Sequence, residues 1–267
     1  MIKTLRTLNV IFFLAMIAVN ALANILPLGN KTTGDVSAKY ANLYTPAPIT
    51  FSIWGIIYIM VSIFIIYQLG IFGDSRIPES MLGQLGLWFV ISCMFNIGWI
   101  LSWHYERIGW SLICMIGLLF SLIMVTMALS PRTVETVSGI SKLPLMAKLG
   151  IWGFDIYLGW ICAATIANIS VFLVSINWNG FGFSGQFYMI LVLVIGAILG
   201  ALFIISNGKY ISAAAIVWAY CGILIKHISK TGYGGEYPLV IFVAVAGIAL
   251  IIVVGMISIM MNKEAIV

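Results

Sequence analysis

Three aromatic residues, Phe51, Trp54 and Tyr58, stand at positions i, i+3 and i+7 in the apolar stretch 44–67. In an α-helix this spacing places all three rings on one face. Pro48 fixes its own φ angle and suits a first helical turn, so we expect the helix to begin there. The stretch therefore predicts a helix whose aromatic face can stack against a ligand.

Two later apolar stretches carry the same kinds of side chain. In one of them Asn96 lies three residues before Trp99. The other carries rings, a small residue and an amide on one face, at i, i+3, i+7 and i+11: Tyr157, Trp160, Ala164 and Asn168. Rings with a few amides predict a site for a flat, mostly apolar ligand held by stacking and hydrogen bonds.

Packing is the competing interpretation, because Trp and Tyr also form belts at membrane interfaces and Asn also joins helices. A role in an interface belt is the favoured interpretation for the tryptophans near predicted helix ends, which are Trp103, Trp110, Trp152 and Trp178. For the deeper Trp54, Trp99 and Trp160 both interpretations stay open.

Asp155 is a carboxylate inside the apolar segment 150–176. A charged group within a membrane is costly, so Asp155 is a candidate proton or cation site. It also lies near the predicted start of that helix. An acid in the first turn, stabilised by the helix dipole and wetted at the interface, is the alternative.

The composition decides the class of protein in which these elements lie. The chain has 267 residues, of which 63% are hydrophobic and 8% are charged, whereas soluble domains have roughly a quarter charged residues. We therefore expect an all-α integral membrane protein that contacts the lipid bilayer. The net charge of +5 comes from basic residues spread over many loops, so no nucleic-acid partner is expected.

A membrane-spanning helix needs about 20 apolar residues. Eight stretches meet this requirement, and no soluble domain fits between them: 7–28, 49–72, 84–103, 109–130, 150–176, 186–206, 210–228 and 238–261. In the sixth stretch Gly196 and Gly200 predict a face of small residues for helix packing.

The first stretch has two interpretations. A basic start and the Ala-Leu-Ala sequence at 21–23 resemble a cleaved signal peptide. However, Asn9, Asn20 and Asn24 fall on nearly one helical face, which favours a helix that stays in the bundle.

The basic residues predict the topology, because cytoplasmic loops carry more Lys and Arg. With eight spans, the side that holds both termini carries Lys3, Arg6, Arg76, Arg132, Lys142, Lys148, Lys209 and Lys263. The opposite side carries Lys31, Lys39, Arg107, Lys226 and Lys230. The excess of eight basic residues over five predicts that both termini lie in the cytoplasm.

The polar loop 29–45 is rich in turn-forming residues and leads directly into the helix that carries Trp54. We expect this loop, with Lys31, Lys39 and Tyr44, to act as a lid over the aromatic site. Either lysine could attract a carboxylate on the ligand.

The sequence lacks a pattern for metal or phosphate binding. His104 and His227 are its two histidines, both at predicted helix ends, and the four cysteines have no ligand spacing. We expect no metal and no resident cofactor. Lys226 and His227 are expected to extend toward the membrane interface.

Three stretches resemble the tryptophan-rich sensory protein and translocator protein (TspO/MBR) family: TPAPITFSIWGIIY, FNIGWILSWHYERIGW and YLGWICAATIANISVF. Trp54 and Tyr58 match the family's Trp and Tyr after a proline-rich entry, and Asn96 and Trp99 match its third helix. The fifth-helix motif is matched by Tyr157, Trp160, Ala164 and Asn168.

The resemblance covers residues 1–178 and is strongest to longer bacterial relatives. It implies a five-helix unit in a bacterial inner membrane, often a homodimer, with a cavity beneath the first loop that binds tetrapyrroles such as porphyrin or haem. Residues 179–267 would add a three-helix extension. The chain departs from the family pattern at Ala47 between two prolines and at Phe172 in place of Trp.

The resemblance implies a membrane receptor or carrier for a porphyrin-like ligand, with no catalytic residue. Three alternatives stay open: an enzyme that breaks down porphyrin with light or oxygen, a transporter of a small metabolite that uses Asp155, and a structural protein whose rings only pack.

Overall fold

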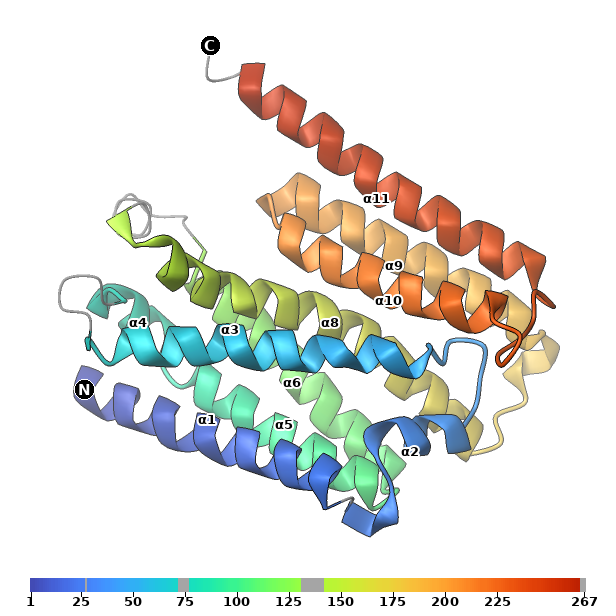
Figure 1. Ribbon diagram of the computed structural model, residues 1–267, viewed down its shortest axis with the longest axis horizontal. Helices are drawn as coiled ribbons and strands as arrows, with labels where there is room; N and C mark the ends of the chain where they lie inside the picture. The colour runs from blue at the N-terminus through green and yellow to red at the C-terminus, as the bar shows by residue number, and fades with distance from the viewer. Residues whose placement is uncertain (27, 72–76, 131–141, 265–267) are drawn as a thin grey trace.

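The computed structural model describes residues 1–26, 28–71, 77–130 and 142–264, which fold into helices joined by loops (Figure 1). The long helices of the first part are α1 (Ile2–Ile25), α3 (Ile53–Gln68), α5 (Trp88–His104), α6 (Ile108–Ala128) and α8 (Leu145–Ser175). Those that follow are α9 (Gly185–Asn207), α10 (Tyr210–Ile228) and α11 (Pro238–Glu264). The shorter helices are η1 (Leu28–Asn30), α2 (Thr33–Lys39), η2 (Pro48–Ser52), α4 (Glu79–Leu85) and η4 (Gly180–Gly182).

Seven of the described helices are long and apolar enough to cross a membrane, and the pair α4 and α5 gives an eighth. The prediction of an all-α membrane protein is therefore confirmed. The third span is bent by 49° between α4 and α5, where a straight helix was expected. Gly86 has φ +53° at this break, a backbone conformation that glycine adopts without steric cost.

One predicted helix start is confirmed, and another differs from the observed one. The helix that carries Trp54 begins with the 3₁₀ turn η2 at Pro48 and becomes α-helical at Ile53. Helix α8 begins at Leu145, directly after Pro144, instead of at residue 150. Proline suits the start of a helix, and no helix-breaking residue separates it from the apolar run.

The helices form two groups, which α10 connects (Figure 1). Helices α1, α3, α5, α6 and α8 pack together, and α9, α10 and α11 pack with one another. Helix α10 also packs along α8, and its Ala215 and Ala219 belong to the hydrophobic core of the first group. The predicted division at residue 178 stays a prediction.

Glycines permit the closest helix contacts. A Cβ atom at Gly159 of α8 would overlap the carbonyl oxygen of Ser212 on α10. The predicted small-residue face of α9 packs closely against neighbouring helices. A Cβ atom added at Gly196 would lie 2.6 Å from the hydroxyl of Tyr220, and one added at Gly200 would lie 2.6 Å from Ile251 Cδ1.

The predicted lid loop contains a helix that the sequence analysis missed. Helix α2 begins with a capping box, in which Thr32 Oγ1 accepts from the Asp35 backbone N–H and the Asp35 carboxylate accepts from the Thr32 backbone N–H. Hydrogen bonds from Thr32 also lower the pKa of Asp35 below its ordinary value. The sequence pattern that could have predicted this helix is Thr32 followed three positions later by Asp35.

The start of α1 and the end of α11 lie toward the same end of the bundle (Figure 1). Lys209 and Asp155 meet at that end, and Lys31, Lys39 and Glu106 meet at the other, as the predicted topology requires. Arg76 and Arg132 lie outside the described residues, as do the side chains of Lys263 and Asn24. Which end faces the cytoplasm stays a prediction.

Candidate functional site

Trp54 is the centre of the aromatic cluster that the sequence predicted. Its ring is stacked on Trp99 and on Tyr58, with ring centroids 5.5 Å apart in each pair. Tyr157 and Trp160 meet it edge to face at 5.6 and 6.1 Å, and Phe51 meets Trp160 at 6.1 Å. Helices α3, α5 and α8 thus bring the predicted rings together, in the geometries that aromatic pairs prefer.

A buried chain of amides and a phenol lies beside these rings. Asn96 Nδ2 donates to the Tyr157 hydroxyl at 2.7 Å, and Asn96 Oδ1 accepts from Asn20 Nδ2 at 2.6 Å. Asn9 Nδ2 likewise donates to Gln68 Oε1 at 2.9 Å. Two of the predicted Asn residues of α1 therefore contact the bundle.

A small pocket of about 40 Å³ lies next to this cluster. Five of the predicted ligand-binding residues line it, together with Tyr44 of the predicted lid: Phe51, Trp99, Trp160, Ala164 and Asn168. We call this the aromatic pocket. Trp54, Tyr58, Asn96 and Tyr157 lie outside its lining. Of these, Trp54 contacts the lining rings Trp99 and Trp160 directly.

Three polar atoms of the aromatic pocket are buried without a hydrogen-bond partner among the described residues. They are the indole N–H groups of Trp99 and Trp160 and the Oδ1 atom of Asn168. The other end of the Asn168 amide donates to Ser111 Oγ at 3.0 Å. Unpaired buried polar groups are costly, so these atoms are candidates for contacts with a ligand.

Glu106 holds the lysines of the predicted lid. Its carboxylate contacts both Lys31 Nζ and Lys39 Nζ, and it accepts from the Tyr40 hydroxyl at 3.0 Å. Sequence reasoning missed Glu106, which lies in the short connection between α5 and α6. Because both ammonium groups contact Glu106 here, attraction of a ligand carboxylate by Lys31 or Lys39 stays a prediction.

The end of α5 also contacts α2. Trp103 Nε1 donates to the Thr33 carbonyl at 3.1 Å, and His104 contacts the Thr33 hydroxyl and the Leu28 carbonyl, each at 3.2 Å. Trp103 is 4% exposed, so its assignment to an interface belt is wrong. By contrast, Trp110 is 65% exposed and has the environment that a belt residue requires.

Helix α10 forms one wall of the aromatic pocket, which the sequence gave no means to predict. Ala219 and Ile223 line the pocket. Residues 42–50, which we call the entry segment, contact α10 closely. The Gly222 carbonyl accepts from the Ala47 N–H at 3.0 Å, and Trp218 Nε1 donates to the Thr50 carbonyl at 2.8 Å.

Two further bonds fix the start of the entry segment. His227 Nε2 contacts the Leu43 carbonyl at 2.9 Å, and the Tyr233 hydroxyl donates to the Asn42 carbonyl at 3.1 Å. His227 is fully buried, so the expectation that it extends to the interface is wrong. The Lys226 ammonium lies 5.9 Å from the centre of the Tyr233 ring. Burial also raises the pKa of Tyr44 in the entry segment.

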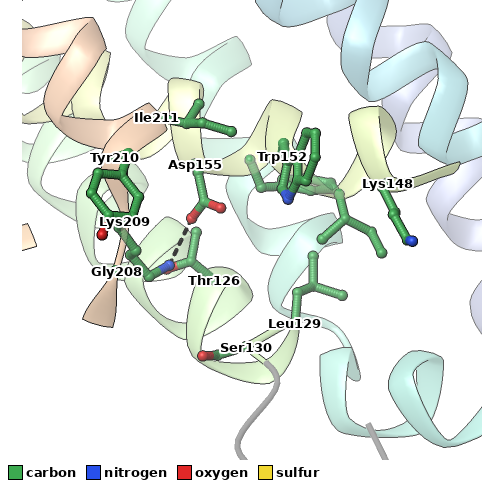
Figure 2. Close-up of a pocket in the computed structure, with 12 residues that line it drawn as sticks. Thr126, Leu129, Ser130, Lys148, Trp152, Asp155, Gly208, Lys209, Tyr210 and Ile211 are labelled. Carbon is green, nitrogen blue, oxygen red and sulfur yellow. Dashed lines mark hydrogen bonds and ion pairs between the residues drawn. The ribbon is translucent and has the colours of Figure 1, made fainter. Parts of the chain in front are cut away.

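Asp155 lies in a second cavity at the other end of the bundle, where its Oδ1 accepts from Lys209 Nζ at 2.7 Å (Figure 2). Since α8 begins at Leu145, Asp155 lies well past the first helical turn, and the first-turn interpretation is wrong. Lys209 comes from the connection between α9 and α10, so sequence spacing could not reveal the pair. Among the described residues no cluster of three metal-ligating side chains occurs.

An all-α bundle that crosses the membrane several times and encloses a pocket of Trp, Phe, Ala and Asn defines a class of multi-pass membrane protein. The model of a family described as TSPO-like protein matches residues 6–257. The chain therefore belongs to the TSPO-like family, and the match runs through α9 and α10 into α11. Searches among curated proteins and among solved structures each gave no match.

Proposed function

We propose that this protein is a membrane receptor or carrier that binds a flat, mostly apolar ligand of the porphyrin type in the aromatic pocket. The observation that supports this most directly is the set of unpaired polar atoms on Trp99, Trp160 and Asn168. Indole rings that carry unpaired N–H donors suit a planar ligand with polar edges. The alanines of α8 leave room beside the rings.

The present pocket is too small to hold a porphyrin. Ligand pockets of drug size occupy about 300–1,000 Å³, whereas the aromatic pocket measures about 40 Å³. A porphyrin therefore enters only if the entry segment and α2 move outward. Their contacts with α5 and α10 combine hydrogen bonds with the buried side chains of Val36 and Tyr44, so opening also exposes apolar surface.

The test is a titration of the full chain in detergent with protoporphyrin, followed by quenching of tryptophan fluorescence. We expect saturable binding at micromolar affinity or tighter, about −8 kcal/mol. Trp160→Phe keeps a ring but removes the N–H donor, so we expect affinity to fall roughly two- to tenfold. Trp54→Phe should also weaken binding, because it loosens the support behind Trp99 and Trp160.

Trp110→Phe is the matched control, since Trp110 lies on the exposed face of α6. It should lower the fluorescence signal and leave the affinity unchanged. Linear quenching that is the same in all variants would show partitioning of porphyrin into micelles and would contradict the proposal. New absorbance bands under light would reveal breakdown of the bound porphyrin.

A further inference from the structure

The loop between α10 and α11, residues 229–237, folds back over the end of α10 and packs around His227. The Gly235 backbone N–H donates to the His227 carbonyl at 2.8 Å. The His227 ring lies against the ring of Tyr233, with centroids 4.7 Å apart, and meets that of Tyr237 edge to face at 5.9 Å. These contacts leave the imidazole fully buried beside the start of the entry segment.

His227 bonds to the entry segment through only one of its two ring nitrogens. Nε2 lies 2.9 Å from the Leu43 carbonyl oxygen, and because a carbonyl only accepts, Nε2 carries the proton of this bond. Nδ1 is buried and has no hydrogen-bond partner among the described residues. The bond to Leu43 therefore requires only the neutral ring, and a proton on Nδ1 would have no acceptor.

The elements packed around His227 offer no buried carboxylate to a charged imidazole. The entry segment contains no charged residue, and neither do α9, the second half of α8 or residues 238–262 of α11. The loop after α10 carries Lys230 and Glu236, which are both exposed. On α10 itself the neighbour is Lys226, a like charge. A second proton on His227 would thus create a buried cation without a counter-ion, which is costly.

We propose that His227 is a proton-sensitive latch on the entry segment: the neutral ring holds the Leu43 carbonyl, and protonation releases the segment from α10. The next residue, Tyr44, lines the aromatic pocket, so release at Leu43 moves a wall of that pocket. The inference rests on the proposed function for its consequence, which is that acid speeds entry and exit of the ligand.

The direction of the pH effect follows from which arrangement of the segment can take up the proton. Once released, the ring is in contact with water and has the ordinary histidine pKa of about 6.5. Well above this pH the ring is neutral in both arrangements, so latching does not depend on pH. Below it only the released arrangement gains a proton, so its population rises as the pH falls. Between pH 7.5 and 5.5 the increase is roughly tenfold.

The test is amide hydrogen exchange of the full chain in detergent without any porphyrin, measured by mass spectrometry at pH 5.5 and 7.5 and corrected for the intrinsic exchange rate at each pH. Exchange reports local opening. The reporter is the peptide that covers the entry segment, where the Ala47 N–H donates to the Gly222 carbonyl. In the wild type we expect its protection to be roughly tenfold lower at pH 5.5.

His227→Gln keeps an N–H donor for the Leu43 carbonyl but does not titrate, so its protection should be the same at both pH values. His104→Gln is the matched control, because this other histidine of the chain contacts Thr33 of α2 and should leave the tenfold ratio intact. Tyr233→Phe removes the bond to the Asn42 carbonyl and should lower protection equally at both pH values.

Equal protection of the wild type at the two pH values would overturn the proposal, whether or not His227→Gln folds. A pH effect that persists in His227→Gln, or that disappears in His104→Gln, would overturn it as well. Because no porphyrin is present, the outcome is independent of the binding titration. If porphyrin does not bind while the exchange follows His227, the proposed function fails and the latch stands.

Discussion

Asn96 connects three helices through one side chain. It donates to Tyr157 of α8 and accepts from Asn20 of α1, so both ends of its amide are paired. Within a bilayer no water can replace these partners, and the amide fixes the rotation of α5 relative to its neighbours. Three residues further along α5, the ring of Trp99 stacks on that of Trp54.

At the residue scale we predict that Asn96→Ala lowers the free energy of unfolding by about 1–3 kcal/mol, since it leaves Asn20 and Tyr157 without this partner. Ser121→Ala is a suitable control, because the Ser121 hydroxyl donates only to the Leu118 carbonyl of its own helix. A double-mutant cycle with Tyr157→Phe, measured by thermal unfolding in detergent, should show coupling. Purely additive effects would count against the link between α5 and α8.

Helix α8 contacts α3 on one face and α10 on another, and glycines allow both close approaches. Gly150 and Gly153 face the backbone of α3, and Gly159 faces that of α10. Small residues are the usual means of close packing in membranes, where lipid competes equally for apolar surfaces. The position of α10 against the aromatic pocket therefore depends on Gly159.

At the element scale we predict that Gly159→Ala destabilises the protein by about 1–3 kcal/mol, because the added methyl overlaps the Ser212 carbonyl. Gly55→Ala in α3 is the matched control, since nothing lies within 4 Å of a Cβ atom there. That change should be neutral or stabilising, by up to about 1 kcal/mol of helix propensity. If both variants unfold at the same temperature, the close α8–α10 contact does not exist in solution.

At the scale of the whole molecule, the segment 210–237 completes the aromatic pocket. It supplies Ala219 and Ile223 to the pocket wall and bonds to the entry segment at four positions: Asn42, Leu43, Ala47 and Thr50. A bundle without α10 would leave the backbone groups of Leu43, Ala47 and Thr50 without these partners. This segment is thus part of the structure that bounds the aromatic pocket.

We therefore predict that a chain of residues 1–178 unfolds at a lower temperature than the full chain and binds protoporphyrin more weakly. Co-expression of residues 179–267 as a separate piece should restore both properties, because the contacts between the two parts are non-covalent. Thermal unfolding and fluorescence quenching measure the two effects. Unchanged stability and affinity of the shorter chain would show instead that the first unit is independent.

Local periodicity determined much of this protein from sequence. The apolar stretches gave the membrane spans, and helical spacing placed Trp54, Trp99 and Trp160 on faces that do meet, since these features depend on residues close in the chain. Tertiary structure alone decided that Glu106 binds Lys31 and Lys39, that Lys209 pairs with Asp155, and that α10 forms a wall of the pocket. The reason is physical: helices that are apolar on all sides pack equally well against lipid or protein, so their sequences leave open which neighbour each face contacts.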